Sequence, residues 1–477
     1  MEQIQLTVRR TLSADVVVIG GGVAGCAAAE AAARHGASVI LVEQSGTLGG
    51  QAGFGLVTPL SSTRTQYTHR PFGGLIAEWM DEIRAESARC CAHAPSGAPH
   101  DVGAAPYILR VILLRRLTAA GVQVRLHTTL LAAESDGRRV VSAAVWDKSG
   151  ALRILGDTFI DGSGDGDLIA MSGASYHYGS EPGVYDALTD THLDVIHEES
   201  GKRFHAESDR AVQPVSLFFR MGGVETETAY ALNNRPLRFG DFGITREAFA
   251  AWRYAGTCGF EPDGSDRIPM PQGRVLVSCS PVAGTVVVNM SRVTGIDATD
   301  ADSLNDGEIR AQLQLIALVD FLKTFIPGFR DSYLIDCAGS LGIRESRRLA
   351  GRRMLTGREV IDGTPQPDRI ARGSYIIDIH DPTGKRKAIG GAIHADAYDI
   401  PYACLLAREF DNLLAVGRCI SADHVAHSST RIQGTCILTG QAAGTAAALA
   451  LRDDMTPADY PVDAIQDALR SDGVALE

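Results

Sequence analysis

The apolar positions in the first forty residues predict one strand–helix–strand unit. Residues 15–19 (DVVVI) form a β-branched run, which is typical of a parallel strand buried on both faces. Residues 24–35 are rich in alanine and predict a helix that packs closely on a sheet, and Gly36 is placed to end that helix. Residues 38–42 (SVILV) predict the second strand. This order is typical of a doubly wound α/β fold.

The pattern then passes through two longer helices into a stretch with a period of two. Helical periodicity covers residues 75–91 and 107–120. The alternating stretch that follows, divided by DGR and DKSG turns, predicts strands at 122–127, 129–134, 140–147 and 151–160. We interpret these strands as a β-meander inserted into the doubly wound sheet.

A second domain is indicated where the strand–helix–strand order stops. Between about 174 and 395 the pattern mixes helix and strand, with one long helix at 302–325 and strands near 215–221, 275–279 and 285–290. Residues 412–416 (NLLAV) then predict another buried strand, and residues 433–450 predict a helix of small residues that resembles the first one. The chain therefore returns to its first domain after a second, α+β domain.

A glycine motif lies between the first strand and the first helix. Gly20, Gly22 and Gly25 form GxGxxG, and Glu43 follows at the end of the second strand. The first glycine allows a tight turn, the second lets the backbone approach a pyrophosphate, and the third allows close contact between helix and strand. Glu43 can accept hydrogen bonds from ribose hydroxyls. The whole unit predicts a Rossmann-like dinucleotide site.

Three later loops are also rich in glycine and follow predicted strands. They are residues 48–51 (LGGQ), 159–167 (FIDGSGDGD) and 412–418 (NLLAVGR). A nicotinamide enzyme normally continues into its next helix after the acidic residue, whereas Gly49 and Gly50 allow the chain to pass close to a ring system. Four such loops suit an extended cofactor that lies across the sheet, which favours FAD over NAD.

Composition narrows the class of protein. Glycine accounts for 51 of the 477 residues, and the formal net charge is −12. The acidic balance argues against a nucleic-acid-binding protein, which needs basic residues to neutralise phosphates. We find neither a secretory signal nor a membrane-spanning segment, and the nine cysteines lack the spacing of a zinc site or a disulfide framework. We therefore expect a cytoplasmic protein with reduced thiols and no metal.

The motifs together resemble a known family. The segments DVVVIGGGVAG, LVEQ, LGG, DGSGDGD, GIRESRRLAG, DNLLAVGRCISADHVAHSSTRIQGTC and GQAAGTAAALA are similar to those of FAD-dependent oxidoreductases of the glutathione-reductase-like type, relatives of fumarate-reductase and tRNA-modifying flavoproteins. The resemblance covers residues from about 13 to 450. It implies an FAD-binding domain made of residues 1–173 and 396–477, with a substrate domain at 174–395.

The resemblance also implies which residues contact FAD. The adenosine would lie on the first glycine loop and Glu43, with the strand around Leu130 near the adenine. Gly417 and Arg418 would take the second phosphate-contacting position, where many relatives have Gly-Asp. The predicted FAD-binding residues are Gly20, Gly22, Gly25, Glu43, Gln44, Gly49, Gly50, Gln51, Leu130, Gly162, Asp165, Gly417, Arg418, Gly434, Thr435 and Cys436.

The start of the last long helix is the expected site of the flavin ring. Residues 433–436 (QGTC) should point at the pyrimidine edge of the flavin. There the positive end of the helix dipole and free N–H groups would stabilise the negative charge of the reduced ring.

Candidates for substrate chemistry are arginines and histidines near these loops. Arg344 and Arg347 lie three residues apart, so one of them can hold a substrate carboxylate, or both can belong to a structural Arg–Glu network. His424 and His427 have the same spacing but lack a third metal ligand, and His427 is the better candidate for a base. The other candidates are Arg431, His380, His394 and Tyr402.

These features predict an FAD-dependent oxidoreductase, either a dehydrogenase or an oxidase. Hydride would pass between a small organic substrate and flavin N5, while His427 or a neighbour takes the proton and Arg344 or Arg431 positions the substrate. Two alternatives stay open at this point: a hydratase or isomerase in which FAD is structural, and a nucleic-acid-modifying flavoprotein. The substrate, the electron acceptor and the oligomeric state are left open.

Overall fold

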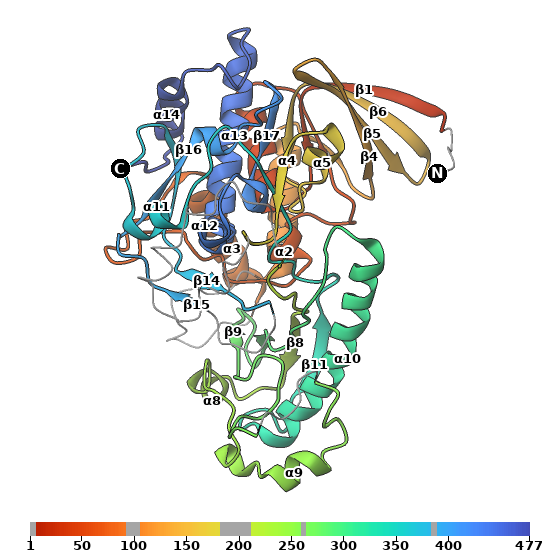
Figure 1. Ribbon diagram of the computed structural model, residues 1–477, viewed down its shortest axis with the longest axis vertical. Coiled ribbons are helices and arrows are strands. Elements are labelled where there is room, and N and C mark those ends of the chain that lie inside the picture. The colour runs from red at the N-terminus through yellow and green to blue at the C-terminus, as the bar shows by residue number, and fades with distance from the viewer. Residues whose placement is uncertain (1–5, 92–104, 182–210, 259–263, 383–388) are drawn as a thin grey trace.

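The protein consists of an α/β part and a smaller part that projects from it (Figure 1). The computed structural model describes residues 6–91, 105–181, 211–258, 264–382 and 389–477. The large sheet and most helices belong to the α/β part, and α8, α9, α10 and the strands around β8 belong to the smaller part.

The large sheet has a parallel centre with the strand order β3-β2-β1-β6-β17 among the described residues. The strands are β1 (Val8–Ile19), β2 (Val39–Val42), β3 (Gln123–Arg125), β6 (Gly150–Asp161) and β17 (Leu413–Ala415). Residues 16–19 pair with β2 on one side and β6 on the other, and all four are buried. The predicted α/β, Rossmann-like fold is therefore confirmed.

The predicted meander differs from the structure in one strand. β4 (Thr129–Asp136), β5 (Arg139–Asp147) and the first half of β6 pair antiparallel in chain order. The strand predicted at 122–127 is instead β3, which pairs in parallel with β2. The reason is that the preceding helix α4 (Pro106–Ala119) carries the chain back across the sheet, so β3 runs in the same direction as β2.

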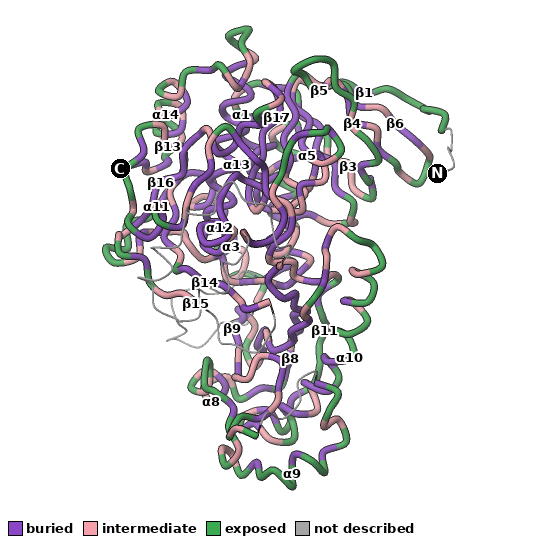
Figure 2. The backbone as a smooth tube through the Cα atoms, viewed as in Figure 1, coloured by how far each residue is buried: buried purple, intermediate pink, exposed green. Residues whose placement is uncertain are grey.

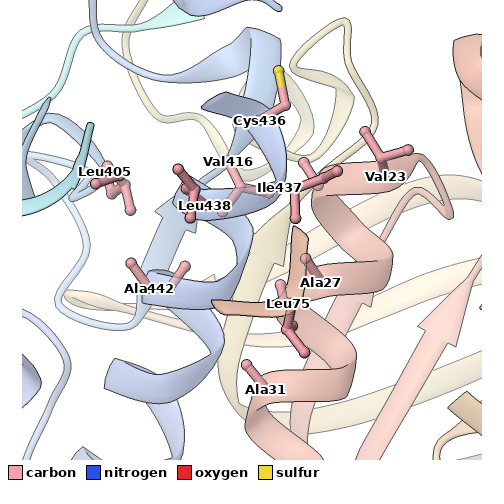
Figure 3. Packing of buried hydrophobic residues seen from close by; sticks show 14 of the residues in the cluster. Val23, Ala27, Ala31, Leu75, Leu405, Val416, Cys436, Ile437, Leu438 and Ala442 are labelled. Atoms are coloured by element: carbon pink, nitrogen blue, oxygen red, sulfur yellow. The ribbon is translucent and has the colours of Figure 1, made fainter. Parts of the chain in front are cut away.

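Two small-residue helices pack directly on each other in the α/β part. These are α1 (Val23–Arg34) and α13 (Gln433–Arg452), and Figure 3 shows Ile437 in the space between them. A Cβ at Gly440 would lie 2.1 Å from the Ala24 carbonyl oxygen, and one at Gly444 would lie 2.1 Å from that of Ala28. Glycine at both positions therefore allows the two helices to approach closely.

The α/β part also contains several further helices and three pairs of short strands. Its remaining helices are α2 (Gly50–Gly53), α3 (Gly74–Cys90), α5 (Asp167–Ser172), α11 (Gly357–Asp362), α12 (His424–Thr430) and α14 (Val462–Ser471), with 3₁₀ turns at Tyr402–Cys404 and Gly417–Cys419. Three antiparallel pairs are β7 (Tyr176–Tyr178) with β12 (Arg347–Leu349), β13 (Arg369–Gly373) with β16 (Tyr398–Pro401), and β14 (Ile377–Ile379) with β15 (Ile389–Gly391). β14 and α12 lie where the two parts meet (Figure 1).

The smaller part is an antiparallel sheet packed on one long helix. Its strand order is β11-β8-β10-β9. The strands are β8 (Phe219–Gly222), β9 (Val277–Cys279), β10 (Val286–Val288) and β11 (Tyr333–Cys337), and the helices are α8 (Thr226–Ala231), α9 (Arg246–Ala251) and α10 (Ala301–Phe325), with a 3₁₀ turn at Asp241–Gly243. The strands and the long helix expected in this region are therefore present.

Each part has its own hydrophobic core, and Figure 2 shows buried backbone running through both. Phe219, Val287 and Phe321 are buried at the centre of the smaller core. Among the described residues, Leu341 is the last one along the chain that is buried in the smaller core. Apolar residues between 349 and 393 instead pack into the cores of the α/β part. The domain limits 1–173, 174–395 and 396–477 stay predictions, and the two cores divide earlier than residue 395.

Helix α13 is long and apolar enough to cross a membrane by length and composition. Almost all of it is buried against other elements of the protein, with α1 on one side. Its apolar surface is therefore explained by its place in the core.

Candidate active site

The first and third glycine-rich loops are in direct contact. Gly20 follows β1 with a φ of 101°, and a Cβ there would lie 2.3 Å from the carbonyl oxygen of Gly162, which follows β6. A Cβ at Gly25 would lie 1.9 Å from the carbonyl oxygen of Gly20. A side chain at Gly20 or Gly162 would therefore push the two loops apart, and one at Gly25 would push the start of α1 away from Gly20.

The second loop lies beside the start of α1. Gly22 forms an isolated parallel bridge with Gly49, whose N–H donates to the Gly21 carbonyl oxygen at 2.8 Å. A Cβ at Gly50 would lie 2.9 Å from Cα of Gly22. The Gly22 backbone is otherwise open, because a Cβ there would have its nearest neighbour at 3.9 Å. This open backbone at a helix start suits the approach of a phosphate group.

Glu43 connects the first loop to the second strand. Its Oε2 accepts the Gly21 N–H at 2.7 Å, and its Oε1 accepts the Ser45 N–H at the same distance. The Thr128 N–H donates to the Glu43 carbonyl oxygen at 3.0 Å, so the start of β4 lies next to it, two residues before Leu130. Gln44 is exposed. The predicted adenosine-binding residues are thus neighbours in space.

The fourth loop places Gly417 between the two central helices. A Cβ at Gly417 would lie 2.8 Å from Cβ of Ala24 in α1 and 3.6 Å from Cβ of Cys436 in α13. Arg418, which follows it, donates from Nη2 to Asp165 Oδ1 at 2.8 Å. The unusual arginine therefore forms an ion pair with the third loop.

The start of α13 is partly covered by another loop. The Gly434 N–H donates to the Ser61 carbonyl oxygen at 3.0 Å, and Thr435 Oγ1 lies 3.0 Å from Ser62 Oγ. The expectation of free N–H groups at this helix start is therefore wrong for Gly434. The physical reason is that residues 61–62 fold against the helix end and use its first donors.

A cluster of charged side chains lies just before α13. Arg431, at the end of α12, donates from Nη2 to the Asp378 carbonyl oxygen at 3.0 Å and lies 3.6 Å from that carboxylate. Arg344 donates from Nη1 to the Pro214 carbonyl oxygen and to Ser216 Oγ. Burial lowers the pKa of Arg344 to about 9, and the charge of Arg431 acts in the same direction. These two predicted arginines are therefore close enough to repel each other.

Arg292, His380 and Gln213 also belong to this cluster. Arg292, from the loop after β10, donates from Nη2 to the Asp381 carbonyl oxygen at 3.0 Å. His380 Nε2 lies 3.3 Å from Asp378 Oδ2, and its backbone N–H donates to Gln213 Oε1 at 3.0 Å. Burial lowers the pKa of His380 to about 4 despite the nearby Asp378 carboxylate. The cluster thus brings together residues of both parts of the protein, just before α13.

The sequence as a whole now identifies the family. Residues 15–469 match the model of the family described as FAD dependent oxidoreductase. The chain belongs to this family of FAD-dependent oxidoreductases. It is therefore a flavin enzyme whose cofactor is FAD, as predicted. The narrower likeness to glutathione-reductase-like flavoproteins stays a prediction.

Distant likenesses to solved structures extend over most of the chain. One is a geranylgeranyl bacteriochlorophyll reductase-like protein from Thermoplasma acidophilum, with 13% identity and a TM-score of 0.44 over 97% of this chain and 84% of that one. Another is p-nitrophenol 4-monooxygenase from Pseudomonas putida, with 9% identity and a TM-score of 0.44 over 96% and 84%. Among curated proteins, no sequence matches the oxidoreductase significantly. These likenesses are too distant to assign an activity.

Buried polar atoms around the loops fit a bound FAD. Gln51 and Gln433 donate from their Nε2 atoms to backbone carbonyl oxygens, but their Oε1 atoms have no partner among the described residues. Thr58 and Thr430 each have an unpartnered buried hydroxyl in the same region of the described chain. Buried polar groups normally find a partner. The polar edge and ribityl hydroxyls of FAD can supply such partners here.

His427 is buried, and neither ring nitrogen has a hydrogen-bond partner among the described residues. Burial lowers the pKa of His427 well below its ordinary value, and Arg348, Arg431 and Arg418 act in the same direction. The imidazole is therefore neutral, and these cations disfavour the imidazolium that a proton acceptor must become.

The other candidates have structural partners. His424 Nδ1 lies 2.7 Å from Glu345, and this carboxylate raises the histidine pKa although burial lowers it. Tyr402 donates its hydroxyl to the Pro457 carbonyl oxygen at 2.8 Å. His394 is half exposed, with its Nδ1 3.7 Å from Asp362. These positions suit structural or surface roles.

Sequence reasoning did not single out Arg292, Gln213 or Asp378. Asp378 could have been noticed, because IDIHD at 377–381 alternates apolar and polar residues before His380. Arg292 and Gln213 carry no such signal, since their loops lie far apart in the chain and meet only in the folded protein.

Proposed function

We propose that the protein oxidises a small organic substrate by passing a hydride to its FAD. The observation that supports this is the polar cluster of Arg344, Arg431, Asp378 and His380, which lies between the glycine-rich loops and the smaller part. When bound, FAD supplies the two-electron acceptor. The chain's own residues must then orient the substrate and remove one proton.

His380 is our candidate for the proton acceptor. Its Nε2 lies 3.3 Å from the Asp378 carboxylate, which can orient the ring and stabilise the imidazolium as it forms. Neither ring nitrogen of His427 has such a partner among the described residues, and three arginines lower its pKa although Glu345 raises it. We therefore move the acid–base role from His427, the sequence-based candidate, to His380, and propose that neutral His427 donates or accepts a hydrogen bond at the cofactor.

Arg344 and Arg431 are proposed to position the substrate. Arg344 is held by Ser216 and the Pro214 carbonyl oxygen through one nitrogen, Nη1. Arg431 is held by Asp378 and by the Ser428 carbonyl oxygen. Both guanidinium groups are thus fixed in place, and among the described residues Arg344 donates hydrogen bonds only through Nη1, which favours orientation of the substrate before reaction.

The cell compartment is part of the proposal. Eight described cysteines are free, and five of them are buried. We propose that the protein works in the cytoplasm, where thiols stay reduced.

The experiment is anaerobic incubation of the purified yellow protein with hydroxy acids, amines, sugars and enoyl compounds. We expect the visible absorbance of the flavin to bleach with one class and to return when oxygen is admitted. The His380→Gln variant should retain the absorbance but bleach slowly. Turnover of an enoyl compound or hydration of a double bond without bleaching would contradict the proposal and favour a non-redox reaction.

A further inference from the structure

The cluster at the junction carries more positive than negative charge. Its cations are Arg344, Arg431 and Arg292, and its carboxylates are Asp378 and the buried Asp381, whose charge acts on Arg292. His380 is neutral at pH 7, because its pKa lies at about 4. The charge of Arg274 also acts on Arg292, so among the described residues the cations of the cluster outnumber its anions.

Several donors in the cluster are unused. Arg292 is 6% exposed, and its Nε has no hydrogen-bond partner among the described residues. Gln213 is fully buried, and its Nε2 likewise lacks a partner within the described chain. Leaving a buried donor unpaired is energetically unfavourable. Such donors indicate a ligand that bears acceptor atoms.

Arg348, a structural arginine of the same protein, differs from Arg292 in how its hydrogen-bond donors are paired. Arg348 is fully buried, and its donors are taken by Glu345, by the Ala422 carbonyl oxygen at 2.9 Å and by the Gly179 carbonyl oxygen at 2.8 Å. Arg292 and Gln213 are also anchored, but each keeps one donor unpaired among the described residues: the Arg292 N–H and carbonyl oxygen bind Gln314 of α10, and Gln213 Oε1 accepts the His380 N–H. Both side chains are therefore held in place, and the Arg292 Nε and Gln213 Nε2 donors have no partner among the described residues.

We propose that Arg344, Arg292 and Gln213 bind a carboxylate group of the substrate. This inference rests on the proposed function and names the class of its substrate. A carboxylate supplies negative charge and two acceptor oxygens, which match the excess of positive charge among the described residues and the unpartnered Arg292 Nε and Gln213 Nε2 donors.

The test is a binding titration of the oxidised holoenzyme with butyrate, a monocarboxylate, and with butyramide, its neutral analogue. Binding is followed by the change in the flavin absorbance spectrum and by the thermal midpoint, neither of which needs turnover. We expect butyrate to shift both and butyramide to shift neither. Arg344→Gln and Arg292→Gln should each weaken butyrate binding by about 10- to 100-fold.

Two further variants separate charge from fold. Arg344→Lys keeps the charge but loses the planar fork, so it should recover only part of the affinity. Arg310→Gln removes one positive charge from the exposed surface of α10, where Arg310 pairs with Asp306, and should bind butyrate like the unmodified protein. If an arginine variant unfolds, the other still tests the proposal.

Each other outcome would overturn the inference. Equal shifts with butyrate and butyramide would mean that charge is not recognised, and a response to inorganic phosphate alone would replace the carboxylate by a phosphate. A lower flavin reduction potential in Arg344→Gln without any butyrate effect would assign the charge to the reduced flavin. Failure of the proposed function is distinct, since butyrate can bind to a protein whose flavin no substrate bleaches, and a neutral substrate can bleach a flavin that butyrate does not affect.

Discussion

Glu43 Oε2 accepts the N–H of Gly21 at 2.7 Å, so the end of the second strand is fastened to the middle of the first glycine loop. The other carboxylate oxygen accepts the Ser45 N–H. One side chain therefore connects the first glycine loop to the turn after β2, and its remaining lone pairs can accept the ribose hydroxyls that we predict here.

Replacing Glu43 by Gln should weaken FAD binding. The amide keeps one acceptor oxygen but turns an NH₂ group toward a backbone N–H, and it removes the negative charge from the ribose contact. We expect a loss of about 1–3 kcal/mol, or about 5- to 150-fold in the FAD dissociation constant. The FAD dissociation constant is measured from the flavin fluorescence as the protein is diluted. Glu227→Gln on exposed α8 is the control and should hold FAD normally, and equal dissociation constants for both variants would refute the assigned role.

Replacing Gly444 by Ala should destabilise the protein. The added Cβ would lie 2.1 Å from the Ala28 carbonyl oxygen, so α13 must move away from α1. We expect the free energy of unfolding in urea to fall by about 1–3 kcal/mol. Gly391→Ala is a matched control, because its Cβ would meet no described atom within 4 Å. An unchanged unfolding midpoint for the Gly444 variant would contradict the close packing of the two helices.

The partly buried His380 should make stability depend on pH. Its pKa is about 4 in the folded protein and about 6.5 when unfolded, so the unfolded chain binds more protons between these values. The contribution of His380 to the free energy of unfolding is therefore fully present above pH 6.5 and decreases as the pH falls toward 4. Urea unfolding of the FAD-saturated protein gives its free energy of unfolding at pH 5 and at pH 7. The difference between these two free energies should be smaller in His380→Gln by about 1–3 kcal/mol. The same difference in both proteins would show that His380 does not cause it.

His380 and His427 should differ in their effects on flavin reduction. Once a substrate is known, His380→Gln should retain FAD and slow flavin reduction by about 10²- to 10⁴-fold, as expected for a lost proton acceptor. His427→Gln should alter the flavin spectrum or FAD retention, with a smaller change in rate. Stopped-flow absorbance under anaerobic conditions separates the two. The opposite result, with the large loss in His427→Gln, would return the acid–base role to the residue that sequence reasoning favoured.

The sequence by itself determined the α/β fold and the cofactor, because their signals are local. The β-branched run before Gly20, the alanine-rich helix after it and the later glycine loops each depend on backbone geometry within a few residues. The family match over residues 15–469 supports the same conclusion. The assignment of 122–127 to the meander failed because strand direction depends on where α4 carries the chain, which a period of two does not report.

Only the tertiary structure decided how the charged residues combine. Arg418 pairs with Asp165, which lies 253 positions earlier, and Arg292 meets Asp381 across 89 positions. No spacing rule connects such residues, because the distance between them is set by the packing of separate elements. The neutral state of His427 has the same origin: burial lowers its pKa, and so do Arg348 and Arg418 from distant segments together with Arg431 of the same helix end.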